Sequence, residues 1–335
     1  MKKKVGVLGA NGALGSQILW VLKDREEFEV TPVYHYKLRV AGESGGYGPA
    51  EMTKIYDGGG DFVELDERCA GRGFSLSDLL DRTKFDVLIN TVAFNSTNEA
   101  DSNPNQAFLL NTIAVYNLAR ECNERRISLV HISTDYVMGI TDVFNISRKP
   151  LTEKDTPNPL NVYGISKYAG EQAVMNYSQG IVVRVAALFG KVGSSSKNGM
   201  NFVYTILKKI KNNELPIQCI NDQWVLPGYT LDVACKIVEI MNNGYPRLYH
   251  ITNSGNPITW YDFGKEIARY VRSEKFVRGN ILPVGSDFFY STTPRARFTA
   301  LETEYFEYRM RPWKDALLSF FENELQLNES INIKF

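Results

Sequence analysis

The sequence predicts a doubly wound α/β fold in which a parallel sheet carries a smaller C-terminal substrate-binding lobe. Short apolar runs rich in β-branched residues alternate with longer stretches of helical period. A glycine-rich turn follows the first run, and a regular helical stretch joins two later runs. The 335 residues are 44% hydrophobic, which is enough for one large domain or two intimately joined ones.

The predicted strands are short, apolar and spread along most of the chain. They span residues 5–8, 30–34, 62–65, 87–90, 129–133, 181–185 and 248–252. Between the fourth and fifth strands, Ala107, Leu110, Ala114 and Leu118 recur at spacings of three and four. This spacing predicts a helix with one face on the sheet, which makes a βαβ crossover.

Two regions interrupt the alternation. Residues 36–60 are rich in glycine and have little periodicity, which predicts a long loop after the second strand. Beyond residue 188 the alternation weakens, and helices are expected over 199–213, 259–274 and 313–326. We therefore expect a Rossmann-type dinucleotide-binding domain and a substrate-binding lobe. The first would span 1–187 and 226–252, and the second would span 188–225 and 253–335.

Charge and cysteine content argue against several function classes. The 38 basic residues balance the 38 acidic ones, so no overall field would attract nucleic acid or an anionic membrane. The apolar start is short and interrupted by glycines, which argues against a signal peptide or membrane span and favours a cytoplasmic protein. With no CxxC pair and only three histidines, we expect no metal site. We expect reduced and mostly buried thiols at Cys69, Cys122, Cys219 and Cys235.

The segment VGVLGANGALG starts as a strand and continues as a helix, with Gly9, Gly12 and Gly15 at spacings of three. Glycine permits positive φ, lets the backbone approach a pyrophosphate and lets the helix pack closely on the strand. A tight turn without a ligand is the plain alternative, but at the first strand of a doubly wound chain we favour a dinucleotide. The expected contacts are Gly9, Asn11, Gly12, Ala13, Leu14 and Gly15, with Thr91, Val92 and Ala93 after the fourth strand.

The end of the second strand indicates which dinucleotide binds. An NAD site normally places an acidic side chain there for the ribose hydroxyls. This chain instead has His35, Lys37 and Arg39 and no carboxylate. We therefore expect NADPH, with NADH as the alternative if these side chains only form the solvated start of the loop.

A hydroxyl, a phenol and an ammonium are expected to meet at the mouth of the sheet. Ser133 and Thr134 end the fifth strand, and about thirty residues later Tyr163 and Lys167 share a helical face at i and i+4. An adjacent lysine cation lowers the pKa of a tyrosine from its ordinary value near ~10, which suits general acid catalysis. Two surface residues are the plain alternative for such a pair. We interpret His131, inside an apolar strand, as a satisfied core histidine.

In these motifs the chain resembles the extended short-chain dehydrogenases/reductases, and within them the dTDP-4-dehydrorhamnose reductases. The resemblance covers nearly the whole chain, and it implies a catalytic triad of Thr134, Tyr163 and Lys167, with Lys167 also at the nicotinamide ribose. The segments that carry it are GANGALG, FDVLINTVAF, HISTDYV, PLNVYGISKYAGE, NDQWVLPGYT and YHITNSGNPITWYDFGKEI. The substrate-side residues that it implies are Asn95, Asn111, Asp135, Tyr136, Asp222, Gln223 and Arg295.

The resemblance implies NADPH-dependent reduction of the 4-keto group of a nucleotide-activated 4-keto-6-deoxysugar, in dTDP-rhamnose and polysaccharide biosynthesis. It is also compatible with a homodimer. An epimerase or dehydratase of the same fold, or a regulatory subunit that binds NADP without catalysis, stays open. A dehydratase usually has Asp-Glu after the strand-end threonine, whereas here Tyr136 follows Asp135. Departures from the family pattern at Val225 and Ala296 lie near the substrate side and leave the sugar open.

Overall fold

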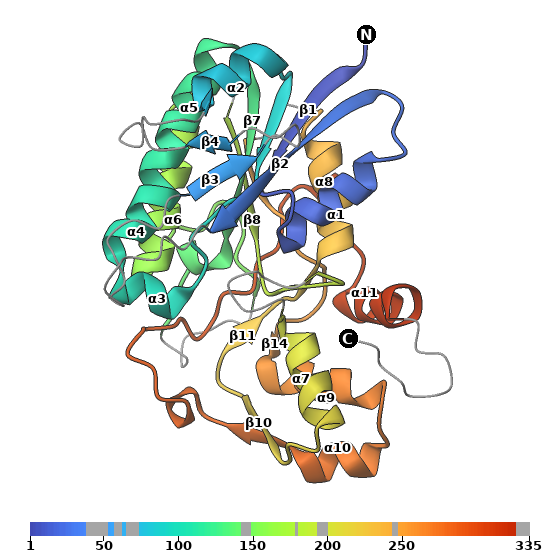
Figure 1. The fold of residues 1–335 in the computed structure, drawn as a ribbon. Helices are drawn as coiled ribbons and strands as arrows, with labels where there is room; N and C mark the ends of the chain where they lie inside the picture. The colour runs from blue at the N-terminus through green and yellow to red at the C-terminus, as the bar shows by residue number, and fades with distance from the viewer. Residues whose placement is uncertain are drawn as a thin grey trace, which may run out of the picture.

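The computed structural model has two lobes, with a sheet-centred lobe above a smaller one in Figure 1. It describes residues 1–37, 53–56, 62–64, 74–141, 149–177, 180–192, 200–242 and 247–325. Within residues 34–75 the description covers only the backbone of the strands. The described residues include no helix that is both long enough and apolar enough to cross a membrane.

Among the described residues, nine strands form the main sheet, in the order β13-β8-β7-β6-β1-β2-β3-β4-β5. The six strands from β13 to β2 pair in parallel, which confirms the predicted fold class. The order reverses at β1, between β6 and β2, and ligands of such folds bind at this switch point. The strands are β1 (Lys3–Leu8), β2 (Phe28–Lys37), β3 (Thr53–Tyr56), β4 (Phe62–Glu64), β5 (Phe74–Ser75), β6 (Val87–Asn90), β7 (Ser128–Thr134), β8 (Gly180–Val185) and β13 (Leu248–His250).

The expectation of a loop over residues 36–60 is wrong in part. Strand β2 continues to Lys37, and β3 lies inside the expected loop. The predicted strand over 62–65 is present as β4, but β3 pairs antiparallel with both β2 and β4. A parallel neighbour needs a crossover, usually a helix, and the glycine-rich stretch has no helical period that would provide one.

Helices cover both faces of the sheet (Figure 1). On one face α1 (Ala13–Leu22) packs against α8 (Thr230–Ile240). The other face carries α2 (Leu76–Thr83), α5 (Ala114–Glu124) and α6 (Val162–Met175). Side chains of β1 alternate between the two cores, because Val5 and Val7 lie in one cluster and Leu8 lies in the other. The predicted crossover helix is present as α4 (Pro104–Phe108), a π-helical turn over Leu109–Ile113, and α5.

In the part of the second lobe that the structure describes, helices pack beside a small parallel pair of strands. Its elements are α7 (Phe202–Lys211), β10 (Ile217–Ile220), α9 (Trp260–Arg269), α10 (Glu274–Asn280) and β15 (Ile281–Val284). The single helix expected over 259–274 ends at Arg269. A new helix begins at Glu274, because the Ser273 side chain accepts a hydrogen bond from the Phe276 N–H and caps it. The last predicted helix is α11 (Trp313–Ser319), followed by a π-helical turn over Phe320–Glu324.

Residues 295–301 join the two lobes. Phe298 bridges to Ile140 of the first lobe and to Trp224 of the second, and Leu301 bridges to Leu151. The residue ranges expected for the two domains stay a prediction. Tyr305, Tyr308 and Met310, which were expected in the substrate lobe, pack with the core of the first lobe.

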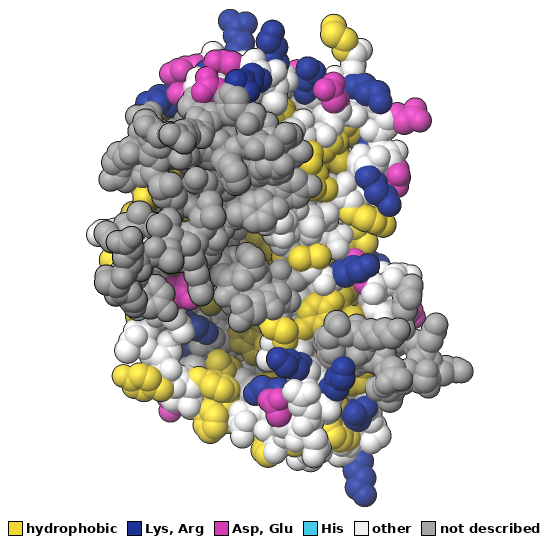
Figure 2. Space-filling view, viewed as in Figure 1, with side chains coloured by type: hydrophobic (Ala, Val, Ile, Leu, Met, Phe, Trp, Pro, Cys, Tyr) yellow, Lys and Arg dark blue, Asp and Glu magenta, His cyan; other side chains and the backbone are white. Residues whose placement is uncertain are grey.

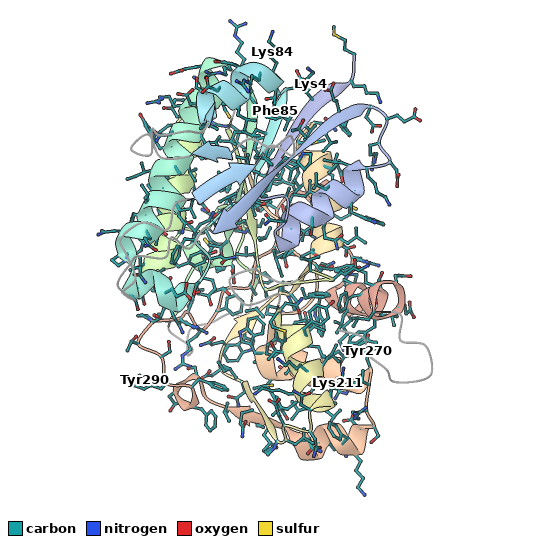
Figure 3. All side chains as sticks on the ribbon, in the orientation of Figure 1. Lys4, Lys84, Phe85, Lys211, Tyr270 and Tyr290 are labelled. Carbon is teal, nitrogen blue, oxygen red and sulfur yellow. The ribbon has the colours of Figure 1, made fainter. Side chains whose placement is uncertain are left out.

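The orientation of the strands places their carboxyl ends at the junction of the lobes. Lys4 at the start of β1 and Lys84 before β6 both lie at the top of Figure 3, far from the second lobe. Figure 2 shows Lys and Arg side chains mixed with Asp and Glu side chains at this edge, where the amino ends of the strands lie. A ligand at the carboxyl ends of the strands therefore lies between the lobes.

The thiols agree with the expectation only in part. Cys122 and Cys219 are buried free thiols, and burial raises the pKa of Cys122 to about 12 and that of Cys219 to about 11. Cys235 is a free thiol at an exposed position, and Cys69 lies outside the described residues.

Candidate active site

A cavity of about 600 Å³ lies at the carboxyl ends of β1, β6 and β7, with walls from both lobes. Most of the residues predicted for the site from the sequence line it. They are Gly9, Asn11, Gly12, Ala13, Leu14, Thr91, Val92, Ala93, Asn95, Thr134, Asp135, Tyr136, Tyr163, Lys167, Gln223 and Arg295.

The glycine turn after β1 contains two glycines that the backbone requires and one that opens to the cavity. Gly9 has φ +80°, and a Cβ there would lie 2.6 Å from Thr91 Oγ1. A Cβ on Gly15 would lie 2.2 Å from the Gly9 carbonyl oxygen, so Gly15 serves packing and does not line the cavity. A Cβ on Gly12 would meet only that same oxygen, at 3.1 Å.

The start of α1 suits a phosphate. Gly12 caps the helix without a side-chain hydrogen bond, and its first turn contains no acidic residue. Gly12, Ala13 and Leu14 all line the cavity. Free N–H groups at a helix N-terminus favour an anion, so the residues present fit the pyrophosphate of a dinucleotide.

The predicted catalytic side chains meet at the cavity. Thr134 ends β7, and the Asn161 side chain accepts a hydrogen bond from the Gly164 N–H and so starts α6 just before Tyr163. The Thr134 hydroxyl lies near the Tyr163 phenol and favours its ionised form. The Tyr163 ring also packs edge-on against Tyr136, with ring centroids 5.5 Å apart.

The expected electrostatic effect of Lys167 on Tyr163 is wrong in this structure. Burial raises the pKa of the Tyr163 phenol well above its usual value, and the nearby Thr134 hydroxyl opposes this only in part. The Lys167 Nζ donates to the Ile132 carbonyl oxygen at 2.7 Å and lies 3.2 Å from His131 Nε2. Burial also lowers the pKa of Lys167 to about 8.

Asp135 supports Thr134 from the inner side of the site. Its carboxylate accepts hydrogen bonds from the Thr299 hydroxyl at 2.7 Å and from the Thr134 hydroxyl at 3.1 Å. Only 5% of Asp135 is exposed, and burial raises its pKa to about 6. The single hydroxyl proton of Thr134 is thus donated to Asp135, and the Thr134 oxygen accepts from the Tyr136 N–H at 3.2 Å.

Two predicted substrate residues are not among those that line the cavity. Asn111 is fully buried, and its amide accepts from the Phe94 N–H and donates to the Phe94 carbonyl and the Ser166 hydroxyl, at 2.8 to 3.0 Å. Asp222 accepts from the Ser286 N–H at 3.0 Å and pairs with Arg297. The amide of Asn111 is fully used inside the protein, whereas the Asp222 side chain is 30% exposed and Asp222 stays a predicted substrate residue.

The side chains of the basic residues expected to select NADPH lie outside the part of the chain that the structure describes. Arg39 is not among the described residues, and only the backbone of His35 and Lys37 is described. Arg295 lines the cavity, is exposed, donates to Asn98 Oδ1 at 3.1 Å and remains a predicted substrate residue.

Sequence reasoning missed the aromatic wall that the second lobe contributes. Phe202 and Trp260 line the cavity, with ring centroids 4.8 Å apart. Phe289 adds a half-exposed ring, next to Tyr290 at the lower-left edge of Figure 3. Such rings bury an apolar or aromatic part of a ligand. Trp260 belongs to the quoted segment YHITNSGNPITWYDFGKEI, but Phe202 and Phe289 lie in no quoted motif, and only the fold brings the three rings together.

Sequence reasoning also missed a buried polar cluster beneath the site. Glu171 of α6 pairs with Arg184 of β8 at 2.7 Å, and side chains of both are at most 3% exposed. Ser133 donates to Glu171 at 2.5 Å, and Arg184 reaches His250 at 3.2 Å. The charged residue inside the apolar run IVVRV was the signal that could have indicated it.

Comparisons with known proteins match this architecture. The family model described as "RmlD substrate binding domain" matches residues 3–326. A "dTDP-4-keto-6-deoxy-D-glucose reductase" of Streptomyces niveus is 32% identical over 74% of this chain and 82% of its own length. A "dTDP-4-dehydrorhamnose reductase" of Mycolicibacterium smegmatis is 30% identical over 69% and 68% of the two chains. The crystal structure of dTDP-4-dehydrorhamnose reductase from Bacillus anthracis in complex with NADP superposes with a TM-score of 0.76 at 26% identity, over 96% and 99% of the two chains.

Proposed function

The chain belongs to the family described as the RmlD substrate binding domain, and on this basis we propose that it is an NADPH-dependent reductase. The substrate is the 4-keto group of a nucleotide-activated 4-keto-6-deoxysugar, as the names of its relatives suggest. The observation that carries the proposal is that Thr134, Tyr163 and Lys167 line the same cavity as the glycine turn after β1.

In the proposed reaction the bound NADPH supplies the hydride that reduces the keto carbon. Tyr163 gives its phenolic proton to the oxygen of that carbon as negative charge develops there. Thr134 donates a hydrogen bond to the same oxygen and stabilises the charge. Lys167 lies one helical turn beyond Tyr163 and holds the nicotinamide ribose.

For the cofactor, we propose that Gly9, Gly12 and the start of α1 hold the pyrophosphate, and that Lys37 and Arg39 favour NADPH through its 2'-phosphate. A charge-assisted contact of about 1.5 to 3 kcal/mol corresponds to roughly a ten- to hundred-fold preference. Replacing Lys37 and Arg39 by alanine should narrow the ratio of kcat/KM for NADPH over NADH. An unchanged ratio would remove these residues from cofactor choice.

Incubation of the purified protein with NADPH and a panel of nucleotide-linked 4-ketosugars tests the proposed reaction. We expect oxidation of NADPH together with an alcohol at the former keto carbon, whose configuration NMR of the product establishes. An epimerase or dehydratase would convert its sugar without net consumption of NADPH. A regulatory subunit would bind NADPH in calorimetry and turn over no sugar in the panel.

We also propose that the protein forms a homodimer, with which the resemblance is compatible. Light scattering on the purified protein measures its mass and tests this directly.

A further inference from the structure

Lys167 lines the cavity, and its nitrogen lies in a buried polar environment at the cavity wall. Lys167 is 1% exposed and His131 is fully buried. The nitrogen has two close polar neighbours on β7, the Ile132 carbonyl oxygen at 2.7 Å and His131 Nε2 at 3.2 Å. The protonation state of the imidazole therefore decides which form of the lysine fits there.

Asn90 fixes the protonation of His131. The Asn90 Oδ1 accepts the Val92 N–H at 3.0 Å, which sets the orientation of the amide. Its Nδ2 then faces His131 Nδ1 at 3.1 Å. Because an amide nitrogen can only donate, Nδ1 must accept, and the ring proton lies on Nε2. Burial and the nearby Lys167 lower the pKa of His131 well below its usual value, which agrees with a neutral ring.

This tautomer directs an N–H group at Lys167. An ammonium has three donors and no lone pair, so it cannot accept that proton. A neutral amine can accept from His131 Nε2 and still donate to the Ile132 carbonyl. The chain Asn90 to His131 to Lys167 to Ile132 is then complete, with one donor and one acceptor at each contact.

The charged groups around Lys167 do not reverse this preference. Burial lowers the pKa of Lys167 to about 8, and the Glu171 carboxylate acts in the opposite direction. The charge of Glu171 is matched by Arg184, whose guanidinium donates to it at 2.7 and 2.9 Å. Ser133 donates to the same carboxylate.

We propose that His131 is a positioning residue that favours the neutral amine of Lys167, so that this lysine gains and loses a proton near neutral pH. This assignment concerns the free protein and needs neither cofactor nor substrate. Its consequence for turnover rests on the proposed reductase function, because only in that reaction does Tyr163 donate a proton with Lys167 beside it.

NMR of the free protein tests the tautomer directly. The chain contains three histidines, so the ring nitrogens of His131 can be assigned by their loss in His131→Gln. We expect a neutral His131 with its proton on Nε2 throughout the range in which an ordinary histidine titrates, around ~6.5. We also expect the Lys167 side chain, assigned by its loss in Lys167→Met, to titrate at about 8 or below. A proton on Nδ1, an imidazolium, or an ordinary lysine titration would overturn the proposal.

Asn90→Asp reverses the direction of the hydrogen bonds from residue 90 through His131 to Lys167, with almost no change in the shape of the side chain. One carboxylate oxygen can still accept the Val92 N–H, while the other accepts a proton from His131 Nδ1, which leaves the Nε2 lone pair facing Lys167. We expect the His131 proton to move to Nδ1 and the Lys167 titration to rise by about one unit or more. If Asn90→Asp does not fold, His131→Gln should raise the Lys167 titration in the same direction, because its amide oxygen can accept from the ammonium.

The matched control is His250→Gln, which alters a buried histidine that contacts Arg184 and the Leu151 carbonyl. It should leave the titration of Lys167 unchanged. An equal shift in this control, or an unchanged lysine titration after the tautomer has reversed, contradicts the role of His131. The pH profile of turnover should move upward in Asn90→Asp with the lysine titration. Absence of turnover in the wild type would contradict the reductase function, and the NMR test of the His131 tautomer would not be affected.

Discussion

Tyr163 is the proposed proton donor, and it lies in a site that opposes ionisation of its phenol. Burial raises its pKa, while the nearby Thr134 hydroxyl favours the phenolate. Tyr163→Phe removes the proton and keeps the ring that packs on Tyr136. We expect turnover to fall on the order of 100-fold or more while NADPH affinity stays nearly unchanged, as measured by steady-state kinetics and calorimetry.

Tyr249→Phe provides the control for this variant, because Tyr249 is a fully buried tyrosine of β13 outside the cavity. Its turnover should match that of the wild type. Near wild-type turnover in Tyr163→Phe would remove Tyr163 from the mechanism.

Asp135 should make stability depend on pH in a defined window. Its pKa is about 6 in the fold and 3.8 as an ordinary aspartate, so between these values the folded state binds more protons than the unfolded state. The contribution of Asp135 to stability is therefore present at low pH and is lost as the pH rises from about 4 to about 6. A shift of about 2 units corresponds to roughly 3 kcal/mol.

Asp135→Asn removes this titration and leaves an amide that can still bond with Thr299 and Thr134. We expect the free energy of unfolding of the variant, relative to wild type, to increase across the same pH window. Urea unfolding of both proteins at several pH values measures this difference. The contributions of the other carboxylates are the same in the two proteins and cancel. A difference that does not vary with pH would show that Asp135 titrates normally.

At the scale of elements, two glycines near the turn between β1 and α1 are expected to have different roles, Gly12 in cofactor binding and Gly15 in folding. Gly12→Val directs a branched side chain toward the cavity, since a Cβ at this position has only the Gly9 carbonyl oxygen nearby. We expect NADPH binding to weaken at least about ten-fold, or about 1.4 kcal/mol. The unfolding midpoint should change little. Calorimetry and thermal unfolding measure the two effects.

Gly15→Ala is the matched variant with the opposite expectation. Its Cβ would lie 2.2 Å from the Gly9 carbonyl oxygen, so the helix must move away from the strand. Such overpacking destabilises by roughly 1–3 kcal/mol or more. Intact NADPH binding by a folded Gly12→Val protein would contradict the assignment of this turn to the pyrophosphate.

At the scale of the whole molecule, residues 295–301 connect the two lobes. Phe298 is 1% exposed and bridges to Ile140 of the first lobe and Trp224 of the second. Phe298→Ala should lower the free energy of unfolding by about 3–5 kcal/mol, because a large buried ring leaves a cavity. If this segment couples the lobes, the variant unfolds in urea in one cooperative transition at a lower urea concentration. Tryptophan fluorescence and circular dichroism should then give the same midpoint.

Phe288→Ala offers a control on a phenylalanine of similar size, since Phe288 is 57% exposed in the second lobe. It should change the free energy of unfolding by less than about 1 kcal/mol. Two separate transitions in Phe298→Ala would show that the lobes unfold independently and that this segment does not couple them.

The sequence by itself determined the parallel sheet, the glycine turn and the pairing of Tyr163 with Lys167 on one helical face. These features depend on local periodicity and fixed spacing, which the chain displays directly. Only the tertiary structure decided that β3 pairs antiparallel, that Asn111 is buried behind the wall, and that rings of the second lobe line the cavity. It also decided that burial raises the pKa of Tyr163 and that His131 faces Lys167. Desolvation and the meeting of distant segments depend on how the whole chain packs, which no local pattern contains.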